Sequence, residues 1–341
     1  MMLFSKIKNA MKNNVIYQWL AAGAIQSNKH HEAKVLAGVQ AGRSDWRQFS
    51  QYFLLFAGVV ALASGVIFFF AFNWDGMSRF TKFALIQGGL LLSTMVYLRL
   101  EGRSLLRQAL LLMVALLMGA WLALVGQTYQ TGADPWQLFA IWSLLILPLV
   151  VVSRFEAMWV LFWLLVNVAL LLYKEVHSSV FGLMFNEETW LYVVILLNAG
   201  FLTLFEALGQ QRFNWQWLRL RWRWPAQLVA FAFLWLVLAV GMAALFDKQM
   251  NTALSVLVFL ITSGGFFVYY RFVLLDVALL GLWSLMSVVV ATALLSKVLI
   301  DKIEDYGILL VIGLAVIGMS VFASKWLLSL KRVQEGGAGH E

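Results

Sequence analysis

A polar stretch from Gly126 to Trp136 separates two long apolar segments and carries side chains that can bind a ligand. Its candidate binding residues are Gln127, Tyr129, Gln130, Asp134 and Trp136. The amides, phenol and carboxylate offer hydrogen bonds to a hydroxylated or cationic group. We therefore predict a substrate-binding site here, and an ordinary solvated loop that only connects two helices is the alternative.

A second polar block, Asn73-Trp74-Asp75, ends the first long apolar segment. The topology argued below places this block on the same side of the membrane as the first stretch. We therefore add Asn73, Trp74 and Asp75 to the candidate binding residues. Contact between Asp75 and Asp134 is an open question, and the tryptophans also fit an aromatic belt at the membrane interface.

The composition of the chain is that of a membrane protein. Of its 341 residues, 62% are apolar and only 12% are charged, and the mean hydropathy is +0.83. Apolar stretches of about 17 to 24 residues recur, each long enough at ~1.5 Å per residue to cross a hydrocarbon core of ~30 Å. We predict an all-α, polytopic helical membrane protein.

Ten transmembrane spans are predicted, at residues 53–72, 83–98, 106–125, 136–152, 157–173, 190–208, 227–246, 253–270, 273–295 and 307–327. The tightest joints fall around Arg154 and Arg271, where an error would change the number of spans by two. The predicted segments are a leader over 1–50, five spans over 51–173, a loop with the sixth span over 174–208, a linker over 209–226, four spans over 227–330 and a disordered tail over 331–341.

The basic residues define an orientation. Nineteen of the 25 Lys and Arg residues fall on the side of the N-terminus and six fall on the other side. Cytoplasmic segments retain the excess of positive charge, so both termini are predicted to be cytoplasmic and the two polar blocks to lie on the outer side.

The leader, residues 1–50, is basic and polar, and its apolar residues Val15, Ile16, Trp19 and Leu20 recur at helical spacing. We expect a helical hairpin on the cytoplasmic surface. An amphipathic segment lying on the membrane and a docking module for a protein partner are both open.

The linker interleaves arginine with tryptophan from Arg212 to Trp224. This pattern is typical of an interfacial segment that faces anionic lipid. The predicted lipid contacts are Arg212, Arg219, Arg221 and Arg223. Stacking on single-stranded nucleic acid is the alternative, but a loop fixed between two spans favours lipid, and no nucleic-acid partner is predicted.

Three polar residues, Asn167, Asn198 and Asp276, lie inside predicted spans, where each needs a partner. Asn167 and Asn198 lie at similar depth in neighbouring spans, so we expect a hydrogen bond between them; a polar passage is the alternative. For Asp276, and for Glu206 near the end of its span, snorkelling or pairing with an arginine is expected. A proton-coupled carboxyl is the alternative for Asp276.

The polar blocks carry a family resemblance. The chain resembles the bacterial inner-membrane family named domain of unknown function 2157 over about residues 15–172. The resemblance rests on Trp19, Gly23, Ala71-Phe72-Asn73-Trp74-Asp75, Gly126-Gln127-x-Tyr129-Gln130, Asp134 and Trp136. It implies a polytopic inner-membrane protein without an established activity, and it does not extend to the second half of the chain.

Several catalytic classes are excluded. The chain has no H-E-x-x-H motif, its four histidines share no span, and no Gly-x-Gly-Asp pair marks an intramembrane aspartyl protease. Zero cysteines also excludes disulfides and thiolate metal sites. We predict no catalytic residue, metal or cofactor.

The preferred function is transport, or handling of a lipid or envelope precursor, at a polar site on the extracytoplasmic rim. A non-catalytic scaffold or assembly factor that uses the leader is the alternative. A lipid-linked glycosyl transferase ranks third: the acid at Asp75 fits it, but the first outer loop is too short to hold a donor sugar and an acceptor. The oligomeric state is open.

Overall fold

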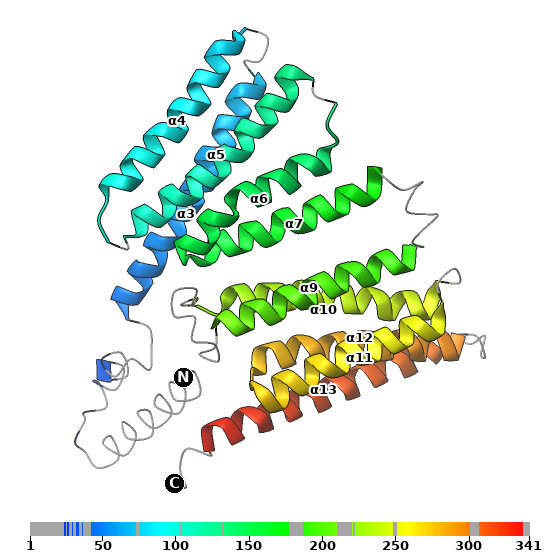
Figure 1. Cartoon of the computed structure of the whole chain (residues 1–341). Helices are drawn as coiled ribbons and strands as arrows, with labels where there is room; N and C mark the ends of the chain where they lie inside the picture. The colour runs from blue at the N-terminus through cyan, green and yellow to red at the C-terminus, as the bar shows by residue number, and fades with distance from the viewer. Residues whose placement is uncertain are drawn as a thin grey trace. The chain divides into compact units, whose positions relative to one another are not determined.

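The structure is a computed structural model of the whole chain. It describes residues 42–72, 76–102, 104–130, 132–176, 187–209, 222–247, 251–300 and 307–336, together with positions 24, 26, 29, 32, 33, 36 and 220. The described part is helical and contains no strand (Figure 1). The predicted all-α class is confirmed.

The helices are α3 (Arg43–Phe72), α4 (Arg79–Arg99), α5 (Leu105–Tyr129), α6 (Pro135–Ser153), α7 (Glu156–Val176), α9 (Glu187–Gly209), α10 (Trp224–Phe246), α11 (Thr252–Val268), the π-helical turn η2 (Tyr269–Val273), α12 (Val277–Ile300) and α13 (Gly307–Gly336). Within the described residues, ten helices are long and apolar enough to cross a membrane. Each coincides with one predicted span, so the chain is a multi-pass helical membrane protein.

Both tight joints are real breaks. At the first, Arg154 adopts a left-handed conformation (φ 49°) that ends α6, and α7 begins two residues later at Glu156. At the second, α11 passes into the π-helical turn, and the chain leaves the helix at Leu274 before α12 begins.

Helices α3 and α13 extend into the segments assigned from sequence to the leader and the tail. Helix α3 begins at Arg43, inside the predicted leader, because Trp46, Phe49 and Phe53 recur at helical spacing and their rings pack in sequence. Helix α13 continues to Gly336, so the first part of the predicted tail is helical. No helix-breaking residue occurs in that part before Gly336. Most of residues 1–41 lies outside the described residues.

The chain divides into two compact units, one formed by residues 54–263 and the other by residues 1–53 with 264–341. In the first unit, α4 packs on α5, α5 on α6 and α6 on α7, while α9 pairs with α10 and both contact α7. In α5, a Cβ on Gly119 would overlap the indole of Trp142, and the Trp142 N–H donates to the carbonyl of Ala115 at 2.8 Å. The bulky ring therefore lies against α5 where a glycine leaves room.

The second unit contains the end of α11, the π-helical turn, α12 and α13. Phe267 packs against Trp283 of α12 and Trp326 of α13, with ring centroids 4.6 and 6.0 Å apart. The rings of Phe266 and Tyr270 contact each other in a tilted arrangement, with centroids 4.5 Å apart, and both residues are buried. These aromatic contacts join the three helices into one core.

Candidate functional site

The predicted binding stretch is partly helical, because α5 continues to Tyr129 instead of ending near residue 125. Gln127, Tyr129 and Gln130 are exposed, and Tyr129 is 65% exposed. No hydrogen bond engages their side chains within the described residues. We call the corner from Gln127 to Trp136 the rim.

Gln130 ends α5 in the left-handed region, with φ 44° and ψ 51°. This conformation favours glycine, because a Cβ there costs roughly 1–2 kcal/mol. Among the described residues, only Gln130 and Arg154 are non-glycine residues with positive φ. The rim therefore keeps a glutamine side chain at a position where the backbone alone would favour glycine.

Asp134 occupies the N-cap position of α6 but makes no side-chain capping bond. The equivalent Ser78 and Ser104 do accept a backbone N–H, from Thr81 and Arg107. The carboxylate of Asp134 is thus not used to cap the helix that it precedes, and it stays available to another group.

Aromatic contacts connect two residues of the rim to α4 and α7. Tyr129 contacts Phe83 of α4 at 6.0 Å between ring centroids, and Trp136 meets Tyr173 of α7 edge to face at 4.7 Å. An apolar cluster around the buried residues Ile86 and Leu124, which includes Trp121 and Phe83, joins α3, α4 and α5 below the corner. The polar groups therefore sit on a packed base.

The other predicted half of the site, Asn73-Trp74-Asp75, lies outside the described residues, so contact between Asp75 and Asp134 stays an open question. Lys82, one turn into α4, is buried (6% exposed). This burial could not be predicted from sequence, because Lys82 directly precedes the predicted span 83–98, where a lysine is usually exposed.

Asn167 and Asn198 form the predicted hydrogen bond, with the Asn198 amide donating to the Asn167 carbonyl oxygen at 2.8 Å. Asn198 also donates to the carbonyl of Val194 and accepts the Trp163 indole N–H at 2.8 Å. Asn167 in turn donates to the carbonyl of Trp163. Both amides thus use their donors within α7 and α9, which favours a packing role. The hydrogen bonds of Trp163 to the two asparagines could not be predicted from sequence, because the apolar spans contain many tryptophans.

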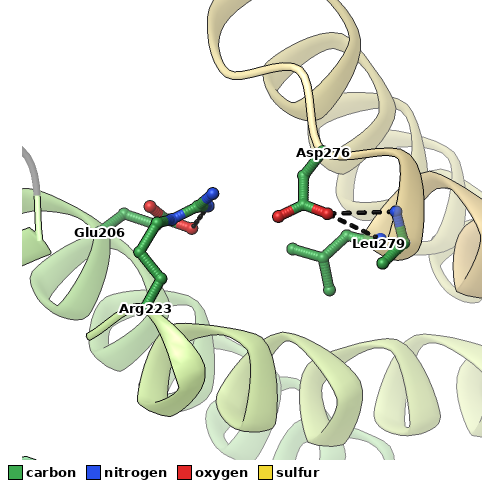
Figure 2. Close-up of polar contacts among 5 residues, drawn as sticks. Glu206, Arg223, Asp276 and Leu279 are labelled. Atoms are coloured by element: carbon green, nitrogen blue, oxygen red, sulfur yellow. Dashed lines mark hydrogen bonds and ion pairs between the residues drawn. The ribbon is translucent and has the colours of Figure 1, made fainter. Parts of the chain in front are cut away.

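A buried ion pair joins α9 to the start of α10. The guanidinium of Arg223 donates to Glu206 at 2.7 Å (Figure 2), and Glu206 is 2% exposed. This contact confirms the expected pairing of Glu206 with an arginine. Beside it, the buried Glu156 of α7 accepts the backbone N–H of Trp222 at 3.0 Å.

Asp276 is buried, at 5% exposed, and caps α12. Its carboxylate accepts the N–H groups of Ala278 and Leu279 at 3.1 and 3.3 Å (Figure 2). This capping role differs from the roles predicted for Asp276 from sequence, which were snorkelling, pairing with an arginine and proton coupling. The signal was present, because an aspartate directly before an apolar run is a typical helix start.

The predicted lipid contacts Arg212, Arg219 and Arg221 lie outside the described residues. Arg223 is described, and its guanidinium points to Glu206. Within the described part of the chain, no group of three or more histidine or acidic residues is arranged to hold a metal ion. The rim residues can bind a polar group by hydrogen bonding and by the charge of Asp134.

Comparison with protein families gives one match: residues 17–159 match the family described as "Predicted membrane protein (DUF2157)". The predicted resemblance is confirmed over these residues, which include α3 to α6 and the rim. Neither a curated protein nor a solved structure matches the chain significantly.

Proposed function

We propose that this membrane protein transports or handles a lipid or envelope precursor, and that the rim binds its polar head group on the extracytoplasmic side of a bacterial inner membrane. Both termini are then cytoplasmic. The observation that carries the proposal is the carboxylate of Asp134, which makes no capping bond, on the same α5–α6 corner as the exposed Gln127, Tyr129 and Gln130. These groups can bind a hydroxylated or cationic head group.

Two further features support binding at this corner. The left-handed Gln130 retains its side chain at a backbone cost, and such strain is often found at functional sites. The end of α5 presents carbonyl groups without partners in their own helix, and the helix dipole adds partial negative charge there. The carbonyl groups at the end of α5 and the negative end of its dipole both favour a positively charged or hydroxyl-bearing group.

Quantifying retained lipids tests the proposal. The full-length chain is extracted into nanodiscs with native membrane lipid, and the bound lipids are measured by mass spectrometry. Asp134→Asn and Gln127→Ala are expected to lose one lipid class that the parent chain retains. The matched control is Thr203→Ala on α9, an exposed hydroxyl that bonds only its own helix, and it should retain that class.

The scaffold alternative gives the opposite result. If both rim variants retain the full lipid complement and support normal envelope composition, while deletion of residues 1–41, which leaves α3 intact, abolishes function in cells, the rim is not a binding site. The leader would then be the functional segment.

A further inference from the structure

The residues around Arg223 alternate between exposed and enclosed. Trp222 is 53% exposed and Trp224 is 42% exposed, whereas the side chain of Arg223 between them is 12% exposed. The two indole rings therefore face outward, and the guanidinium is turned into the protein to meet Glu206. Tryptophan, rather than arginine, forms the outer surface at this point.

Two buried glutamates hold this corner in place. Glu206 on α9 binds the side chain of Arg223, and Glu156 on α7 binds the backbone N–H of Trp222. We call these two contacts the clasp. Because the clasp uses a backbone group and the arginine, it fixes the position of both rings without engaging either indole.

Helix α10 places the rings at a membrane boundary. It begins at Trp224 and has 23 residues, which gives a length of about 34 Å at 1.5 Å per residue, enough to cross a ~30 Å hydrocarbon core. Exposed residues follow one face of the helix at i, i+4, i+7 and i+11: Trp224, Leu228, Phe231 and Trp235. This apolar face ends at Trp224.

We propose that Trp222 and Trp224 are an interfacial anchor that inserts into the head-group region of the bilayer and is held by the clasp. Tryptophan prefers this depth because its ring is apolar and its N–H is polar. The occupant is the lipid interface, because the rings continue the apolar face of α10 and Arg223 presents no charge outward. The anchor lies at the start of α10, is independent of the rim and adds a second lipid contact to the proposed function.

Depth measurements on labelled chain test the anchor. The chain contains no cysteine, so Trp222→Cys, Trp224→Cys and Trp235→Cys each give one labelling site on the full-length protein. A nitroxide on each is exposed in lipid vesicles to oxygen, which partitions into the bilayer, and to a water-soluble nickel chelate. The matched control, Trp235→Cys, lies on the same face of α10 and three turns farther along it.

The expected ratio of oxygen to nickel accessibility rises from position 222 to 224 and is highest at 235. Labels at 222 and 224 that are as accessible to nickel as label on a water-exposed site would overturn the anchor, because the surface would then face a soluble partner. Labels as deep as position 235 would overturn it as well, because the rings would lie in hydrocarbon.

The clasp is tested separately with Glu206→Gln in the Trp222→Cys background. Loss of a buried charge partner should make the cysteine react with a maleimide about tenfold faster or more. The Arg223→Lys variant keeps the charge and should give a smaller increase. An unchanged rate in Glu206→Gln would show that the clasp does not hold the rings, and the depth measurement in the parent background decides the anchor independently.

Discussion

The rim and the interior of α7 and α9 both contain amide side chains in an apolar protein, and they use them differently. The Asn198 amide donates to Asn167 and to the carbonyl of Val194, and the Asn167 amide donates to the carbonyl of Trp163. Gln127 and Gln130 are exposed and engage no partner in the described part of the chain. A polar group without a partner at the membrane surface is available to a ligand, whereas the interior pair serves packing.

The largest effect is expected at the buried ion pair. Arg223→Ala leaves the carboxylate of Glu206 buried without this cation, which should lower the free energy of unfolding by about 3–5 kcal/mol. Thermal unfolding in detergent measures the loss. The double variant Glu206→Leu with Arg223→Leu should recover most of it, and a double variant as unstable as Arg223→Ala would show that packing, and not charge, dominates.

Substitutions at two glycines of α5 compare the packing of its middle with that of its C-terminal end. A Cβ at Gly119 would overlap the ring of Trp142, whereas a Cβ at Gly126 would meet nothing within 4 Å. Gly119→Ala should therefore destabilise the protein by roughly 1–3 kcal/mol. Gly126→Ala should be neutral or slightly stabilising. Equal effects in thermal unfolding would mean that the end of α5 at Gly126 is packed as tightly as its middle at Gly119.

The interior network predicts a smaller loss. Asn198→Leu removes its bonds to Asn167 and Trp163, and such interhelical bonds are worth roughly 0.6–2 kcal/mol in membranes. A double-mutant cycle with Asn167→Leu measures the coupling between the two amides. Additive losses would show that the two side chains do not stabilise each other.

The left-handed residues separate stability from binding. Gln130→Gly and Arg154→Gly should each stabilise the protein by about 1 kcal/mol, because glycine relieves the positive φ. Only Gln130→Gly should also weaken lipid retention, since Arg154 lies at the other end of α6. Retention lost equally in both variants would argue that backbone strain, and not the glutamine side chain, matters.

The ten spans follow from hydrophobicity and length, and they were predicted from sequence because the bilayer imposes both. The bond between Asn167 and Asn198 was predictable for the same reason, since both lie at one depth in consecutive spans. The capping role of Asp276 could have been predicted, because an aspartate directly before an apolar run is a typical helix start. The burial of Lys82 could not, because it depends on which way the start of α4 faces. The extension of α5 into the polar stretch was missed because Gln and Tyr are compatible with a helix as well as a loop.

The most direct test of the rim replaces Tyr129 with a photoreactive benzophenone amino acid in native membranes. The same replacement at the exposed Phe231 of α10 is the control for general lipid contact. We predict that irradiation at position 129 captures one polar lipid or precursor, and that Asp134→Asn abolishes this adduct but leaves those at position 231 unchanged. Adducts at position 129 that match those at 231 and do not depend on Asp134 would contradict a binding site at the rim.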